Sequence, residues 1–143
     1  MFMSRTGNTC RAAELIGEEL VRRGCEVTVR PVDGVDYAEV AEADLVCVGT
    51  WVDGLILFGH RPGDTGKLRK VPMLWNKPVA AFMTYALHAG SVINEFASFL
   101  QDDMGAYVVA GQAMKRSDVE AYIEGFVDDI ATEMNFLKRS VNS

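Results

Sequence analysis

Six consecutive residues near the start of the chain have the side chains of an anion-binding loop. They are Ser4, Arg5, Thr6, Gly7, Asn8 and Thr9, and they run directly into the first predicted helix. The three hydroxyls can donate hydrogen bonds to phosphate oxygens, and the glycine lets the backbone approach an anion closely. The free N–H groups and the dipole of a helix N-terminus also favour negative charge. The segment therefore predicts a phosphate-binding loop; the alternative interpretation is a Gly-Asn turn with a threonine cap.

Other kinds of phosphate loop do not fit the sequence. It contains no Gly-Lys-Ser/Thr and no Gly-x-Gly-x-x-Gly, which excludes the common nucleotide-binding loops. The gap between Cys25 and Arg30 is too short for a cysteine-phosphatase loop, and Pro31 stands where that loop needs a hydroxyl. The pair Gly49 and Thr50 ends a predicted strand without an aspartate, which disfavours a phosphoacceptor domain.

Short apolar runs predict the strands that would position this loop. Residues 45–48, 79–83 and 106–110 are continuously apolar, which is typical of parallel strands covered by helices on both faces. Residues 25–30 alternate between apolar and polar side chains, so they are predicted to form an edge strand that ends at Pro31. Residues 1–3 are the remaining candidate, and at about 10 Å they would form a shortened first strand.

Apolar residues at helical spacing predict three longer helices between and after these strands. The first is expected to end at Gly24, and the second to begin after Ser91 and end at Gly105. The third is expected to begin with a capping box formed by Ser117 and Glu120. Their apolar stripes, which indicate core packing, contain Ala13, Ile16, Leu20 and Val21; Val92, Phe96, Phe99 and Leu100; and Val119, Ile123, Phe126, Val127, Ile130 and Met134.

The alternation of strands and helices predicts an α/β fold. With right-handed crossovers it gives one domain over residues 1–143, a doubly wound three-layer α/β/α sandwich with a five-stranded parallel sheet. A short helix is also expected before the third strand. In such folds ligands bind beyond the carboxyl ends of the strands, where the strand order reverses. The loops after the first, third and fourth strands are therefore the candidate functional segments.

Composition narrows the class of protein. The chain has 143 residues, of which 49% are apolar and 24% charged, as in ordinary soluble globular proteins. The net charge of −6 argues against nucleic-acid binding.

The three cysteines form no Cys-x-x-Cys pair and the only histidines are His60 and His88, so no zinc site is expected. No apolar run is long enough to span a membrane and no signal peptide is recognisable, so we expect a cytoplasmic location.

The phosphate-loop residues resemble those of the flavodoxin family. The segment from Ser4 to Thr9 is similar to the family pattern Ser/Thr-x-Thr-Gly-Asn-Thr and lies after the first predicted strand, as in flavodoxins. The resemblance extends over essentially the whole chain and corresponds to the short-chain form. It implies a sheet with strand order 2-1-3-4-5 and a non-covalently bound FMN at the point where that order reverses.

Two further loops resemble the segments that hold the flavin ring in this family. The resemblance implies that Trp51 and Tyr85 stack on opposite faces of the isoalloxazine. The alternative for Trp51 is a position at the edge of the core, and the alignment of Tyr85 rests on position alone. The implied cofactor-binding residues of the two loops are Thr50, Trp51, Val52, Asp53 and Gly54, and Thr84, Tyr85, Ala86, Leu87 and His88.

The segment 55–76 departs from ordinary flavodoxins. Between Arg61 and Lys70 it has four basic residues and one acidic residue, whereas an electron-transfer flavodoxin usually surrounds its flavin with acids. A basic loop beside the flavin could receive the phosphate of NAD(P)H, a quinone or a partner subunit. The alternative is a solvated loop whose apolar part folds inward.

Three functions are compatible with the sequence. The favoured one is an FMN-binding electron carrier that works with a redox partner protein or a small-molecule acceptor, as a monomer or a homodimer. The second is an NAD(P)H-dependent FMN oxidoreductase that acts on a quinone-like acceptor, which the 55–76 segment favours. The third is a flavin-free module that keeps the fold, which the shortened first strand favours.

Overall fold

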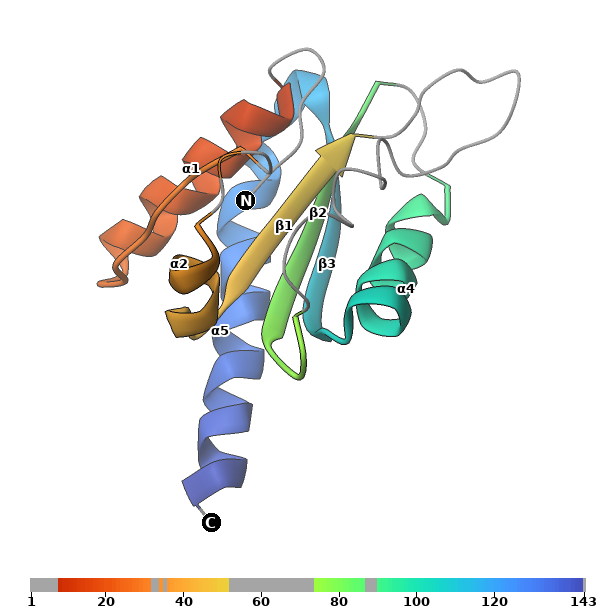
Figure 1. Cartoon of the computed structure of the whole chain (residues 1–143). Coiled ribbons are helices and arrows are strands. Elements are labelled where there is room, and N and C mark those ends of the chain that lie inside the picture. Colours follow the sequence, from red (N-terminus) through yellow and green to blue (C-terminus); the bar gives the residue numbers. More distant parts are fainter. Residues whose placement is uncertain (1–7, 32–33, 35, 52–73, 87–89, 143) are drawn as a thin grey trace.

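Helices lie on both sides of a parallel sheet in the computed structural model of the chain (Figure 1). The structure describes residues 8–31, 34, 36–51, 74–86 and 90–142; within these ranges the side chains of Asn8, Trp51 and residues 136–142 are not described. The helices and the sheet form three layers. The α/β fold class predicted from the sequence is confirmed.

Three parallel strands form the described part of the sheet, in the order β1-β2-β3. They are β1 (Val46–Trp51), β2 (Pro78–Tyr85) and β3 (Tyr107–Lys115). They correspond to the predicted third, fourth and fifth strands, and they occur in the predicted order. The predicted first strand, residues 1–3, lies outside the described residues.

The prediction of an edge strand at residues 25–30 is wrong, because the structure places no strand there. The alternating apolar side chains have a different role. A Cβ atom added at Gly17 would lie 2.9 Å from a methyl group of Val29 and 3.4 Å from one of Val27, so these valines pack against the first helix. Within residues 25–30 the period-two pattern therefore reflects packing against a helix, and an isolated bridge follows at Pro31.

The helices occupy the predicted places. They are α1 (Asn8–Arg22), the short α2 (Tyr37–Glu42), α4 (Val92–Met104) and α5 (Glu120–Asn142), and a 3-10 turn over Arg116–Asp118 precedes α5. The predicted stripes are buried or partly buried except at Val21, which is 56% exposed. Val21 lies beside Val27 and Val29 in the wall of an open groove of about 380 Å³, and not in the core.

Glycines end two helices as predicted. Gly24 has φ +93°, and the N–H of Cys25 donates to the carbonyl of Leu20 at 3.0 Å, which closes α1. Gly105 has φ +72° and closes α4, where the N–H of Ala106 donates to the carbonyl of Leu100 at 3.1 Å. A residue with a Cβ would be strained at both positions.

One of the two predicted N-terminal caps is confirmed. Ser91 stands at the N-cap of α4, as predicted, although its side chain makes no hydrogen bond there. The capping box of Ser117 and Glu120 is wrong, because Ser117 lies inside the 3-10 turn that runs directly into α5. The N–H of Tyr122 donates to the carbonyl of Val119 at 3.0 Å, so the turn supplies an acceptor that a cap would otherwise provide.

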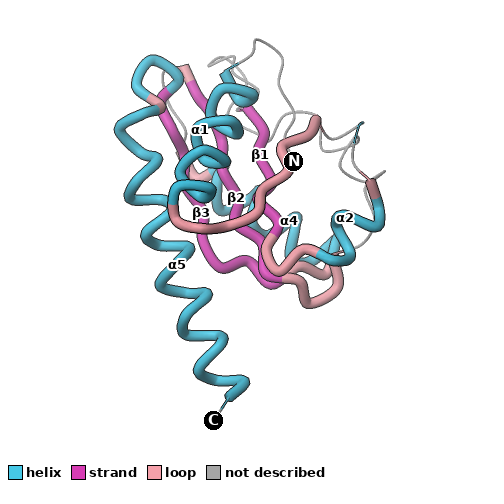
Figure 2. The backbone as a smooth tube through the Cα atoms, turned by 90° about the vertical axis from the view of Figure 1, so that its left-hand side faces the viewer, coloured by secondary structure: helices cyan, strands magenta, loops and turns pink. Residues whose placement is uncertain are grey.

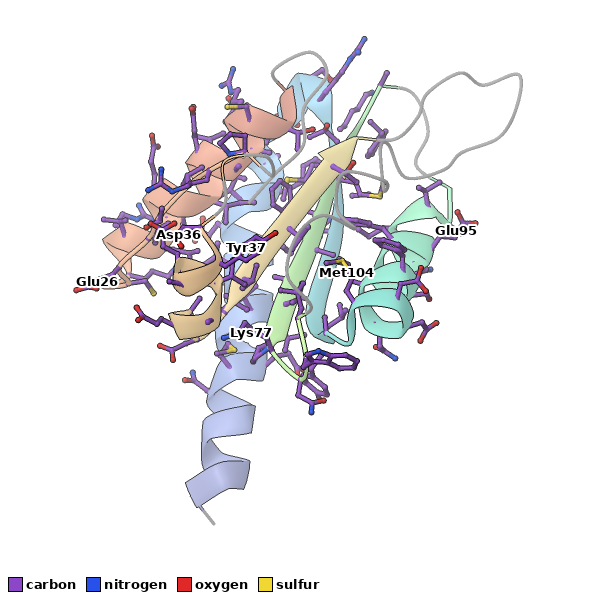
Figure 3. The ribbon with its side chains drawn as sticks, in the orientation of Figure 1. Glu26, Asp36, Tyr37, Lys77, Glu95 and Met104 are labelled. Carbon is purple, nitrogen blue, oxygen red and sulfur yellow. The ribbon has the colours of Figure 1, made fainter. Side chains whose placement is uncertain are left out.

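Each face of the sheet packs against its own hydrophobic cluster. On one face the central strand β2 contributes Val79, Ala81 and Met83, and α4 covers them. Figure 3 shows Met104 pointing from α4 toward this layer, while Glu95 points away from it. On the other face β2 contributes Ala80 and Phe82, which α1 and α5 cover. Figure 2 shows α1 and α5 side by side over that face, where they contact each other.

A lysine connects α2 to the start of β2. The Lys77 Nζ donates hydrogen bonds to the backbone carbonyls of Ala41 and Ala43, at 3.1 and 2.5 Å. These carbonyls belong to the C-terminal end of α2, where a helix has acceptors without partners and favours a cation. Figure 3 shows Lys77 in this position beside α2. In the described part of the chain, no helix is long and apolar enough to cross a membrane.

Candidate functional site

The carboxyl ends of β1 and β2 and the N-terminal end of α1 lie at the same edge of the sheet, the upper edge in Figure 1. Across the ladder Thr50 pairs with Met83, and Trp51 pairs with Thr84. The loops that follow these strands therefore start next to one another. The segment that precedes α1 joins it at the same edge. All three predicted cofactor segments thus meet the described structure at one place.

A buried hydrogen bond links two of these segments. The Oγ1 atoms of Thr9 and Thr84 are 2.9 Å apart, and the two residues are only 1% and 3% exposed. Thr9 lies in the first turn of α1, and Thr84 is next to last in β2. Because a buried hydroxyl without a partner is costly, each threonine fixes the place of the other. The predicted phosphate loop is therefore attached to the end of the central strand.

The end of β1 is held by close packing over a glycine. Gly49 pairs with Phe82 across the ladder, and a Cβ atom at Gly49 would lie 2.1 Å from the Phe82 ring. The next residue, Thr50, has no exposed surface. The absence of a Cβ at Gly49 leaves the space that the far end of the Phe82 ring occupies at this point. The strand that leads to the predicted aromatic loop is therefore positioned by the core directly beneath it.

Tyr85 is held by a tyrosine that the sequence analysis did not include. Tyr85 is the last residue of β2 and is partly buried. A side-chain hydrogen bond with Tyr122, followed by burial, raises the pKa of Tyr85. Tyr122 lies in the first turn of α5, outside that helix's predicted apolar stripe. No local pattern could have indicated this contact, although helix N-termini after parallel strands do gather at the carboxyl edge.

Charges at this edge are mixed. The first turn of α1 has no acidic residue, so no carboxylate opposes an anion at its N-terminus. Arg11 forms an ion pair with Glu120 of α5. Lys115 ends β3 and Arg116 begins the following turn, and both are exposed. The edge therefore has cationic groups in a protein whose net charge is −6.

The structure describes about half of the predicted site. Thr9, Thr50, Thr84, Tyr85 and Ala86 are described in full, and Asn8 and Trp51 are described in their backbones alone. Asn8 is the first residue of α1, Trp51 is the last of β1, and Ala86 is an exposed residue after β2. The other predicted residues lie outside the described part of the chain: Ser4, Arg5, Thr6, Gly7, Val52, Asp53, Gly54, Leu87 and His88.

Two other predictions concern cysteines and the basic segment. Among the described residues, no group of histidines, cysteines and acids could hold a metal ion. Cys47 is partly buried against the cluster under α1 and α5, and burial raises the pKa of its thiol to about 11.

Most of the 55–76 segment lies outside the described residues, so the NAD(P)H-dependent alternative stays a prediction.

A family model described as a flavodoxin domain matches residues 1–135. The chain belongs to the flavodoxin family. This match confirms the resemblance that the residues 4–9 and the two aromatic loops indicated. The parallel order β1-β2-β3 is the part of the flavodoxin sheet that contains the third, fourth and fifth strands. Comparison with curated proteins gave no match.

Solved structures with a similar fold include flavodoxins and one larger enzyme. The flavodoxin of Streptococcus pneumoniae TIGR4 has 22% identity and a TM-score of 0.68, over 92% of this chain and 95% of that one. A flavodoxin from the domain Archaea has 22% identity and a TM-score of 0.63, over 92% and 94%. The rubredoxin oxygen:oxidoreductase of Desulfovibrio gigas has 20% identity and a TM-score of 0.73, over 99% of this chain and 36% of that one. At these identities the likeness shows the fold.

Proposed function

We propose that this chain binds FMN non-covalently at the carboxyl edge of its sheet and carries electrons between redox partners. The observation that carries the proposal is the buried hydrogen bond between Thr9 and Thr84. It fixes the start of α1, where the phosphate loop ends, against the end of β2, where one aromatic loop begins. The family match supports a flavin as the ligand.

The described residues fit a flavin phosphate at the start of α1. The first turn of that helix has no acidic side chain, and its first N–H groups have no partners within the helix. Thr9 is bonded to Thr84, so the other side-chain donors of the loop are Ser4, Arg5, Thr6 and Asn8. Such donors and a helix N-terminus are together a suitable environment for a phosphate dianion.

The ring of the cofactor would lie between the two aromatic loops. Trp51 ends β1 and Tyr85 ends β2, and the two strands are adjacent in the ladder. A side-chain hydrogen bond with Tyr122 raises the pKa of Tyr85, so the phenol of Tyr85 has a partner from α5. Bound FMN supplies the electron-accepting group, and these side chains bind it, orient it and exclude water from it.

The phosphate loop is tested by removing one of its hydroxyls. Thr6→Val should raise the Kd for FMN about 10- to 100-fold, because a hydrogen bond to a charged group contributes roughly 1.5–3 kcal/mol. The Kd is measured by quenching of flavin fluorescence. The matched control is Thr132→Val on α5, where the hydroxyl donates to the carbonyl of Asp128 within the helix.

The comparison with riboflavin makes this test specific. Riboflavin lacks the phosphate, so Thr6→Val should leave its affinity almost unchanged. The control Thr132→Val should bind both flavins as the wild type does. Equal FMN affinities for Thr6→Val and the wild type would contradict the assignment of residues 4–9 as the phosphate loop.

A further inference from the structure

Most of the basic side chains that the structure describes are paired within the chain. Arg11 pairs with Glu120, and Arg30 pairs with Glu39. Arg22 and Arg23 both pair with Glu19, and their hydrogen bonds lower the pKa of that carboxyl group. Lys77 is bonded to two backbone carbonyls. These five basic side chains are therefore already paired with other groups of the same chain.

Lys115 and Arg116 differ from these paired basic residues. Both side chains are exposed, and neither forms an ion pair or a hydrogen bond with any residue that the structure describes. They are adjacent in the sequence, at the junction between β3 and the 3-10 turn. Two exposed neighbouring cations repel each other, and no described residue offsets that repulsion by pairing with them. Within the described part of the chain, their charge is available to another molecule.

The place of these two residues connects them with the proposed flavin site. Lys115 pairs with Tyr85 across the ladder, so it lies at the carboxyl edge of the sheet beside the proposed wall of the flavin. A partner that accepts electrons must approach the flavin from this edge. Any partner that does so from the side of β3 meets Lys115 and Arg116 first.

The local charge is opposite in sign to the charge of the whole protein. Asp118 lies in the same 3-10 turn and offsets one of the two cations, and the neighbouring Glu120 is neutralised by Arg11. Among these described residues one net positive charge therefore remains at this corner of the sheet, in a chain of net charge −6. Such asymmetry orients an approaching charged partner as well as attracting it.

We propose that Lys115 and Arg116 form the docking site for the acidic surface of a redox partner protein. The proposal rests on the proposed flavin function and identifies the chemistry of the partner. The two cations steer an acidic face toward the carboxyl edge of the sheet, whereas the rest of this acidic protein repels it. Because both side chains are exposed, the attraction is expected to act on the rate of encounter and to weaken with salt.

The test measures electron transfer from the FMN-loaded, two-electron-reduced protein by stopped-flow absorbance. The anionic probe is ferricyanide and the cationic probe is hexaammineruthenium(III). Each reduced protein molecule gives two electrons to two probe ions, and the protons pass to the buffer. The test variant is Lys115→Gln/Arg116→Gln. The control is Arg22→Gln/Arg23→Gln, at the last residue of α1 and the residue after it, which changes the net charge by the same amount.

At low ionic strength the test variant should reduce ferricyanide about ten-fold more slowly than the wild type, a size within the usual range of electrostatic steering. It should reduce the cationic probe faster, and both differences should disappear at high salt. Poly-L-glutamate, an acidic macromolecule, should inhibit the wild type and should inhibit the test variant less. The control variant should show only the smaller effect of its net charge.

Three results would overturn the proposal, and they are distinguishable. Equal slowing of the test and control variants would show an effect of net charge alone. A wild-type dimer in sedimentation that the test variant abolishes would assign the two cations to contact between copies of this chain. A folded protein that stays colourless with FMN would contradict the proposed function itself, and the docking site with it.

Discussion

Single residues position the candidate site through contacts that are buried and specific. The hydroxyls of Thr9 and Thr84 lie in the core and satisfy each other, so neither helix α1 nor strand β2 can shift without exposing a polar group to an apolar environment. At the next position of the strand, Tyr85 is partly buried and has a hydrogen bond with Tyr122 of α5. The position of the candidate site therefore depends on particular side-chain hydrogen bonds as well as on the residues predicted to touch the cofactor.

The threonine pair leads to a prediction about coupling. Thr9→Val and Thr84→Val should each lower the free energy of unfolding by about 1–3 kcal/mol, because each leaves a buried hydroxyl without a partner. The double variant should lose clearly less than the sum of the two, since it leaves no hydroxyl unpaired. Urea unfolding followed by circular dichroism measures all four proteins. Additive losses would contradict a direct bond between the two side chains.

At the scale of elements, the sheet positions the site because its strands pack tightly on each other. Phe82 lies over Gly49 of the neighbouring strand, and its ring also meets Phe126 of α5 edge-on, with the ring centroids 6.3 Å apart. This contact connects β1, β2 and α5 beneath the carboxyl edge. A larger side chain at Gly49 would therefore displace the end of β1, where Trp51 lies.

Two glycine substitutions should have opposite effects on stability. Gly49→Ala should lower the free energy of unfolding by about 1–3 kcal/mol, because the added methyl would overlap the Phe82 ring. Gly125→Ala should raise it by up to about 1 kcal/mol, because Gly125 is an exposed position inside α5 with open space around it. Urea midpoints measure both. A neutral Gly49→Ala variant would contradict the close packing of β1 on Phe82.

Much of this arrangement could be predicted from the sequence because it follows from apolar patterning. The continuous runs located the three described strands, and the helical stripes located α1, α4 and α5. The runs stop short of the strand ends, however. Val48 ends the first run, but β1 continues through Thr50, because a buried threonine can stay in a ladder. Hydrophobicity alone misses such polar residues at the ends of strands.

The wrong predictions came from patterns that have more than one structural meaning. The alternation in residues 25–30 fits an edge strand, but it equally fits valines that pack on Gly17 of a helix. Ser117 and Glu120 have the spacing of a capping box, but a 3-10 turn already joins β3 to α5. Tyr122 was missed because its partner Tyr85 is distant in the sequence. Local patterns do not specify contacts that form only when the sheet assembles.

At the scale of the whole molecule, the fold separates stability from function. The two hydrophobic clusters hold α4 on one face of the sheet and α1 and α5 on the other. The carboxyl edge between these layers carries the buried threonines, the tyrosine pair, and Lys115 and Arg116, which have no partner among the described residues. The family match extends over residues 1–135, which includes every residue named at this edge. The central claim is that this edge binds FMN.

The most direct test is the visible absorption spectrum of the purified protein after incubation with excess FMN and removal of free flavin by desalting. We expect the flavin bands to remain with the protein at about one FMN per chain. Riboflavin under the same conditions should be lost, because it lacks the phosphate that residues 4–9 are proposed to bind. A protein that is folded by circular dichroism but retains no FMN would contradict the account.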